Sequence, residues 1–158
     1  MGGTEEGRAQ GSAGNPRRTT LQRSLPATPE SADAILTEIM EAVESAPFSC
    51  GDVDEIRLAL REALNNAVKH GSKLDASKTI HVACRLDPSE GFWVSIRDEG
   101  KGFDPNRVPD PTAPENLERF SGRGLFMIRE LMDKVEYHDG GREIRMTRRP
   151  RPAEDTPA

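Results

Sequence analysis

The chain alternates between stretches with helical and with strand periodicity. Apolar residues recur every three or four positions in two early segments, which predicts two amphipathic helices, the second running to Gly71. Thr28 before Pro29 is typical of a helix start, and Asp52 and Glu55 have the spacing of a capping box. The positions of the first helix that are expected to face a core are Ala32, Ile35, Leu36, Ile39, Met40 and Val43.

Strict alternation of apolar and polar residues marks the strands. Residues 79–86 and 91–98 alternate in this way, and residues 19–26 are predicted to form a short edge strand. A third helix is predicted for residues 122–135, followed by a hairpin that turns at residues 139–141. The residues expected to point inward from this helix are Leu125, Ile128, Leu131, Met132 and Val135.

The order of elements, β-α-α-β-β-loop-α-β-β, predicts an α/β fold: a two-layer α/β sandwich. Hairpin links between neighbouring strands favour a mixed, mostly antiparallel sheet with three helices on one face. The folded domain is expected to span residues 19–149. Residues 1–18 and 150–158 lack periodicity and are predicted to be disordered tails, and the proline-rich residues 104–121 are predicted to form a long loop.

Composition narrows the class of protein. The chain has 158 residues, of which 34% are hydrophobic and 4% aromatic, as expected for one domain with unfolded segments. A net charge of −5 argues against binding nucleic acid or an anionic membrane through bulk charge. There is no apolar run of transmembrane length and no apolar signal-peptide segment at the start. Cys50 and Cys84 lack metal-ligand spacing and are expected to be small buried residues of a cytoplasmic protein.

The second helix carries an unusual polar face. Glu62, Asn66 and Lys69 project almost opposite its apolar side, with His70 beside them. The apolar side consists of Leu60, Ala63, Leu64 and Ala67. A solvated helix face has the same pattern, so this helix alone does not distinguish a structural from a chemical role.

Two glycine-containing segments favour the chemical role. By alternation, Asp98 falls on the apolar side of its strand, where a carboxylate needs a hydrogen-bond donor. Gly100 and Gly102 follow it and allow a sharp turn and the close approach of a flat ligand. Further on, Gly122 and Gly124 keep side chains away from a helix start, whose free N–H groups suit phosphate.

Together the three segments predict a nucleotide site. Asp98 can accept a hydrogen bond from the amino group of a purine, and Lys69 can neutralise a phosphate oxygen. Asn66 offers a carboxamide oxygen to Mg²⁺, which prefers oxygen ligands. Glu62, one turn before Asn66, can take a proton from an incoming hydroxyl group.

The three segments resemble the N, G1 and G2 boxes of the gyrase, Hsp90, histidine kinase and MutL (GHKL) superfamily of ATP-binding domains, which have the Bergerat fold. The matching patterns are E-x-x-x-N-A-x-x-H-G from Glu62, D-x-G-x-G-F-D from Asp98 and G-x-G-L from Gly122. Their spacing, and the phrase LPATPE before the first helix, are most similar to bacterial anti-sigma factor serine/threonine kinases of partner-switching systems. The resemblance covers about residues 20–148.

The resemblance implies a role for each matching residue. Glu62 corresponds to the catalytic base and Asn66 to the Mg²⁺ ligand, while Asp98 would bind adenine in a pocket lined by Gly100 and Gly102. Residues 104–121 would form the lid over ATP. The remaining nucleotide-binding positions are Lys69, His70, Gly122, Arg123, Gly124 and Leu125.

The same resemblance implies cofactors and partners. ATP and Mg²⁺ would be used to phosphorylate a serine or threonine of a STAS-type anti-anti-sigma protein. Kinases of this kind also sequester a sigma factor, commonly as homodimers, and no direct contact with nucleic acid or membrane is expected.

Two other functions share this nucleotide site. A nucleotide-dependent regulator can control a partner by binding alone, although a base such as Glu62 is not required for pure binding. A histidine kinase needs an acceptor histidine on a helical hairpin before the ATP-binding domain, and no histidine precedes His70.

Overall fold

The computed structural model of the chain describes residues 18–101 and 122–151. Its strands are β1 (Thr19–Pro26), β2 (Thr79–Asp87), β3 (Gly91–Arg97), β4 (Lys134–His138) and β5 (Glu143–Arg148). Its α-helices are α2 (Pro29–Ser45), α3 (Val53–Asn65) and α5 (Gly122–Leu131), and two short helical segments are η1 (Asn66–Gly71) and η3 (Asp139–Gly141).

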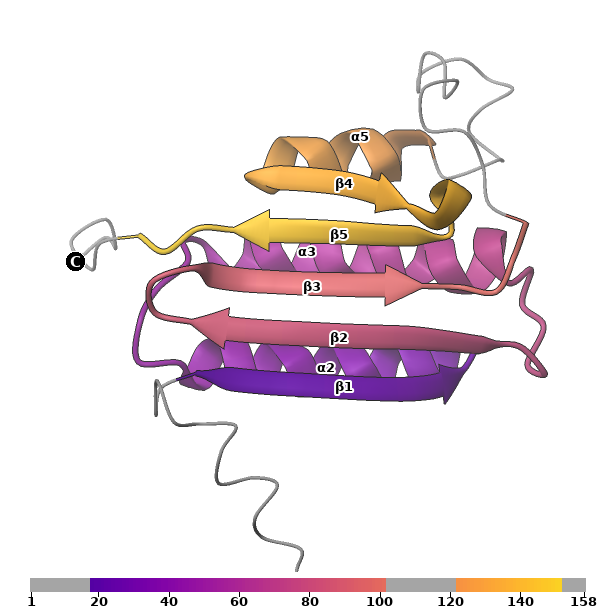
Figure 1. Cartoon of the computed structure of the whole chain (residues 1–158), viewed down its shortest axis with the longest axis horizontal. Coiled ribbons are helices and arrows are strands. Elements are labelled where there is room, and N and C mark those ends of the chain that lie inside the picture. The colour runs from indigo at the N-terminus through magenta and orange to yellow at the C-terminus, as the bar shows by residue number, and fades with distance from the viewer. Residues whose placement is uncertain (1–17, 102–121, 152–158) are drawn as a thin grey trace, which may run out of the picture.

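Within these residues the strands form one sheet in the order β1-β2-β3-β5-β4, and each neighbouring pair is antiparallel. Helices α2, α3 and α5 cover one face of the sheet and leave the other face open (Figure 1). The two-layer α/β sandwich and the edge position of residues 19–26 are thus confirmed. No helix in the described ranges is both long enough and apolar enough to span a bilayer.

The core lies between the sheet and the two long helices. Alternate residues of β2 and β3 and the predicted apolar faces of α2 and α3 are buried there. The largest fully buried side chains include Ile35, Ile39, Leu60, Leu64, Ile80, Leu86, Phe92 and Ile96. Cys50 and Cys84 are free and buried, as expected, and burial raises the pKa of the Cys84 thiol to about 12.

The two helix starts differ in how closely they follow the sequence prediction. Thr28 caps α2, since its Oγ1 accepts a hydrogen bond from the Ser31 N–H at 3.1 Å. Asp52 caps α3 by accepting from the Asp54 N–H at 2.8 Å. The predicted capping box is wrong, however, because Glu55 Oε1 instead accepts from Arg148 Nη2 at 2.7 Å. A buried guanidinium is a stronger donor to a carboxylate than a backbone N–H.

The third helix is shorter than predicted. It ends at Leu131, and Val135 belongs to β4 rather than to the helix. The chain leaves the helix because the Asp133 N–H donates to the Thr147 carbonyl of β5 at 2.9 Å, which begins the pairing of β4 with β5. Ile128 and Met132 are buried as expected, being 0% and 5% exposed. The side chain of Leu125 is not among those described.

A buried arginine joins the ends of the two helices that flank the candidate site. Arg148 is 4% exposed and donates hydrogen bonds to the Leu131 carbonyl at the end of α5 and to Glu55 at the start of α3. Of the predicted tails, residues 1–18 and 150–158, residues 1–17 and 152–158 lie outside the described residues. The chain is described as far as Arg151, whose N–H donates to the Ser49 carbonyl at 2.7 Å.

Candidate functional site

The helix with the predicted polar face changes its hydrogen bonding at Asn66. Helix α3 is α-helical to Asn65, and the segment η1 continues it as a π-helix to Gly71. The Ser72 N–H accordingly donates to the Ala67 carbonyl, five residues back, at 2.8 Å. Single π-turns inside helices occur frequently at functional sites. The sequence predicted a helix to Gly71 but not this change in its last turn.

The polar residues on this helix are not all solvated. Glu62, Asn66 and His70 are half-buried, whereas Lys69 is exposed. Burial lowers the pKa of the His70 imidazole, and the charges of Lys69 and Lys73 lower it further, so the ring is neutral at pH 7. A purely solvated face would leave all four side chains exposed.

Asn66 has the property expected of a metal ligand. Its Oδ1 is buried and has no hydrogen-bond partner among the described residues. Buried acceptors are normally satisfied, so this oxygen suits a cation or a donor on a ligand. The described residues contain no group of three or more His, Cys, Asp or Glu side chains that could hold a metal ion. Mg²⁺ commonly keeps several waters and binds through few protein ligands together with substrate phosphates, so a single side-chain oxygen such as that of Asn66 fits this ion.

Asp98 lies on the helix-covered side of the sheet, as the alternation of β3 predicts, and is 8% exposed. Its Oδ1 accepts from the Gly100 N–H at 2.7 Å, and its own N–H donates to the Arg142 carbonyl at 2.9 Å. Burial raises the pKa of this carboxyl group, while the Gly100 N–H and the charges of Arg142, Lys78 and Arg97 oppose the increase. Within residues 18–101 and 122–151 its second oxygen, Oδ2, accepts no hydrogen bond and suits a donor on a ligand.

The end of η1 and the loop after β3 are in direct contact at Gly71. A Cβ atom on Gly71 would lie 2.2 Å from Asp98 Oδ2, and one on Gly100 would lie 1.9 Å from the Gly71 carbonyl oxygen. Both distances are shorter than any real contact of a Cβ atom, so both positions need glycine. The missing side chain of Gly100 thus makes room for the helix end. This contact brings the segment of Glu62 and Asn66 to the segment of Asp98.

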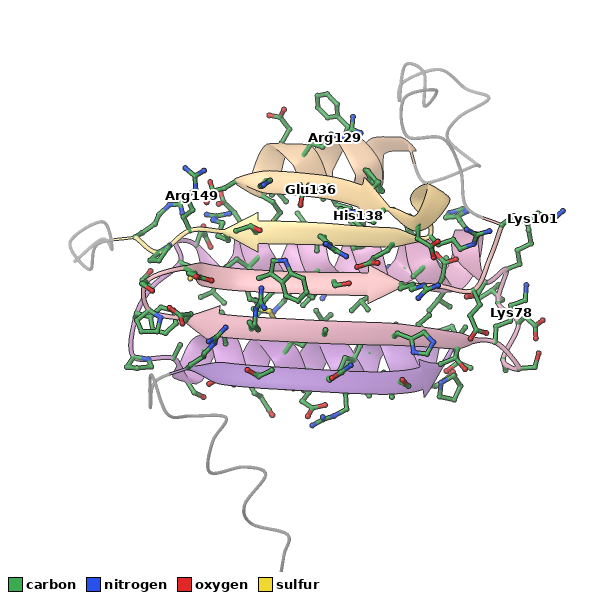
Figure 2. The ribbon with its side chains drawn as sticks, in the orientation of Figure 1. Lys78, Lys101, Arg129, Glu136, His138 and Arg149 are labelled. Atoms are coloured by element: carbon green, nitrogen blue, oxygen red, sulfur yellow. The ribbon has the colours of Figure 1, made fainter. Side chains whose placement is uncertain are left out.

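Positive charge gathers at the same end of the sheet. Lys78 precedes β2 and Lys101 follows β3, and both lie where β3 ends (Figure 2). Lys69 adds an exposed ammonium group near the end of η1. Each of these ammonium groups is a suitable partner for an anionic ligand such as a phosphate.

The other predicted site residues are described only in part. Gly102 and the proposed lid, residues 104–121, lie outside the described residues. Helix α5 begins at Gly122, so the G-x-G pattern occupies its first turn and α5 packs against α3. The side chains of residues 122–125, which include Arg123 and Leu125, are not among those described.

Two residues near Asp98 were missed by sequence reasoning. The Arg142 Nε donates to the Gly100 carbonyl at 2.8 Å. Ser72, directly after the quoted N box, is fully buried, and its Oγ has no hydrogen-bond partner in the described part of the chain. Ser72 follows a glycine and Arg142 follows a glycine turn. Both patterns are common in loops, so neither indicated a functional site.

Comparisons with known proteins identify the family to which the chain is similar. Residues 25–148 match the family model of the histidine kinase-like ATPase domain. The serine-protein kinase RsbW of Listeria monocytogenes serovar 1/2a is 33% identical over 138 residues, covering 83% of this chain and 86% of that protein. RsbW of Staphylococcus epidermidis is 30% identical over 133 residues, covering 80% and 84%.

A solved structure has the same fold. The crystal structure of the RsbU and RsbW domains of a Mycobacterium tuberculosis protein superposes with a TM-score of 0.56 at 22% identity. The match covers 85% of this chain and 34% of the other, so this chain spans about a third of that longer protein. At this identity the likeness supports the fold alone.

Proposed function

The chain belongs to the family of histidine kinase-like ATPase domains that includes the RsbW serine-protein kinases, and we propose that it is an ATP-dependent protein serine/threonine kinase. The observation that carries the proposal is the contact between Gly71 and Asp98. It joins the polar end of the α3–η1 helix to the Asp98 loop, which supports one site for the proposed base, metal ligand and adenine acceptor.

Asp98 is proposed to accept a hydrogen bond from the adenine amino group. One carboxylate oxygen is already bonded to the Gly100 N–H, which fixes the orientation of the group. Gly100 and Gly102 would complete the adenine pocket. Because the side chain is buried, the hydrogen bond to a purine would form away from competing water, which favours selective recognition.

Asn66 is proposed to hold Mg²⁺ through its unsatisfied buried oxygen. The ion would supply positive charge that neutralises phosphate oxygens. Lys69 and His70 would face the phosphates from the end of η1. The start of α5, with Gly122, Arg123, Gly124 and Leu125, would contribute helix N–H groups to them.

Glu62 is proposed to act as the general base. It lies one helical turn before Asn66 and is half-buried. Its carboxylate would remove the proton from the substrate hydroxyl as the hydroxyl oxygen bonds to the γ-phosphorus and the bond to the oxygen of the ADP leaving group breaks. A positioned base of this kind contributes about 10²- to 10⁴-fold to the rate.

The proposed protein substrate is a STAS-type anti-anti-sigma protein. The proposed second partner is a sigma factor, which the chain would sequester. The chain itself is proposed to act as a homodimer. This proposal extends the likeness to the RsbW kinases. It predicts that the two partners compete for the chain. A reconstituted mixture that forms a stable ternary complex at every ratio, without displacement, would rule out partner switching.

Calorimetric titration with ATP tests the nucleotide site directly. The wild type should bind ATP more tightly with Mg²⁺ than with excess EDTA. If ATP binds but no phosphate reaches any tested STAS protein, the result favours a regulator that acts by binding alone. Absence of ATP binding would remove the proposed function altogether.

A further inference from the structure

The turn between β4 and β5 has an unusual backbone. Its three residues all adopt left-handed conformations: Asp139 has a φ of 55°, Gly140 of 64° and Gly141 of 88°. Glycine adopts this region freely and aspartate tolerates it, so the sequence Asp-Gly-Gly suits a tight turn of this kind. The turn lies at the end of the sheet where β3 finishes (Figure 1).

Arg142 follows this turn and binds the Asp98 loop from both its backbone and its side chain. Its carbonyl oxygen accepts from the Asp98 N–H at 2.9 Å, and its Nε donates to the Gly100 carbonyl at 2.8 Å. The guanidinium is itself oriented, because Nη1 donates to the Asp139 carbonyl at 3.1 Å. The Asp139 carboxylate in turn pairs with Arg97, at the end of β3, at 2.8 Å.

These contacts form a chain of hydrogen bonds that ends at the candidate adenine acceptor. The Gly100 carbonyl accepts from Arg142, and the Gly100 N–H donates to Asp98 Oδ1 at 2.7 Å. Gly100 is therefore held on both sides and packs on Gly71. Fixing this residue fixes the direction of the carboxylate.

We infer that Arg142 is a positioning residue of the nucleotide site: through the Gly100 carbonyl it holds the 98–101 loop so that the Asp98 carboxylate stays in place against Gly71. The part of this inference that concerns nucleotide rests on the proposed function. The part that concerns the loop does not, because each contact is present in the protein alone.

Arg145 provides a control on β5, three residues after Arg142. Its side chain is 38% exposed, as is that of Arg142, and its Nε also donates one hydrogen bond, to Glu143 at 2.7 Å. It pairs with Ser95 and Glu136 in the sheet, and its side chain bonds to Glu143 rather than to the 98–101 loop. A nonspecific effect of losing an arginine in this part of the chain should appear at both positions equally.

The test compares Arg142→Ala, Arg142→Lys and Arg145→Ala in the full chain. Hydrogen exchange without nucleotide should be faster at the Gly100 amide in Arg142→Ala, and ATP affinity should fall about 5- to 30-fold, as for loss of one or two hydrogen bonds. Phosphotransfer at saturating ATP should stay within a few-fold of wild type. Arg142→Lys should restore only part of the affinity, because an ammonium lacks the paired Nε and Nη1 donors. Arg145→Ala should match wild type.

Each result decides a separate point. Unchanged Gly100 exchange in Arg142→Ala overturns the inference whatever the nucleotide does. Faster exchange with wild-type ATP affinity also overturns it, because the loop would then be held without consequence for the site. Equal effects in Arg145→Ala would assign the loss to removal of an arginine in this region rather than to the contact with Gly100, and would overturn the inference. If the wild type does not bind ATP, the proposed function and the nucleotide role of Arg142 fail together, while the exchange measurement still decides whether Arg142 holds the loop.

Discussion

A methyl group at position 71 would collide with the Asp98 carboxylate. The Cβ of Gly71→Ala would lie 2.2 Å from Oδ2 and 2.3 Å from Cγ of Asp98. Gly71 does not have a positive φ, so alanine carries no backbone penalty there and the cost is steric. Non-bonded heavy atoms approach to about 3.5 Å, and the carboxylate must therefore move by about 1 Å.

This displacement has consequences for both stability and binding. Overpacking of a buried site costs about 1–3 kcal/mol in the free energy of unfolding. Moving the carboxylate also breaks its 2.7 Å hydrogen bond from Gly100 and turns it away from adenine. Loss of a hydrogen bond to a charged group corresponds to about a 10- to 100-fold fall in ATP affinity.

The assay combines urea unfolding with calorimetric ATP titration in a double-mutant cycle. In an Asp98→Ala background the atoms that Gly71→Ala strikes are absent, so the second substitution should cost less than about 0.5 kcal/mol. ATP binding should be weak in both variants that lack Asp98. Wild-type stability and ATP affinity in Gly71→Ala would refute the packing argument, and an equal cost in both backgrounds would assign the effect to a partner other than Asp98.

Two further substitutions test neighbouring groups. Asn66→Ala should abolish the Mg²⁺ dependence of ATP binding, because its buried oxygen is the one side-chain ligand proposed for the ion. Calorimetry with and without EDTA measures this dependence, and an unchanged dependence would place the metal elsewhere. Burial raises the pKa of the Asp98 carboxyl group in the folded protein above its ordinary value of 3.8. The contribution of this group to the free energy of unfolding is therefore fully present below pH 3.8 and is lost as the pH rises through the folded pKa. Asp98→Asn should therefore unfold at a higher urea concentration than wild type at pH 7, and this difference should shrink towards pH 3. The variant should also bind ATP more weakly. A difference in unfolding that does not vary with pH would contradict burial of the charged carboxylate as the cause.

Local patterns were sufficient to predict most of the fold. The alternation in residues 91–98 places Asp98 on the helix-covered side, and the structure confirms its burial. The Thr28–Pro29 start of α2 and the apolar face of α3 follow in the same way, since each depends on residues within a few positions.

Contacts between distant segments decided the rest. Glu55 pairs with Arg148, 93 residues later, instead of closing a capping box, and pairing of Asp133 with Thr147 ends α5 before the helical periodicity does. The contact of Gly71 with Asp98 likewise joins segments that no local pattern links. Local periodicity does not show which distant residue will form a stronger contact than the local one.

The central claim is that Glu62 serves as the base in phosphate transfer at this site. Its most direct test is transfer of label from γ-labelled ATP to the serine of a STAS-type protein, measured for wild type and Glu62→Ala beside an ATP titration on the same preparations. The proposal predicts that Glu62→Ala keeps most of its ATP affinity, because Asn66 and Asp98 are intact, while transfer falls about 10²- to 10⁴-fold. Unchanged transfer in Glu62→Ala, or no transfer by a wild type that binds ATP, would contradict it.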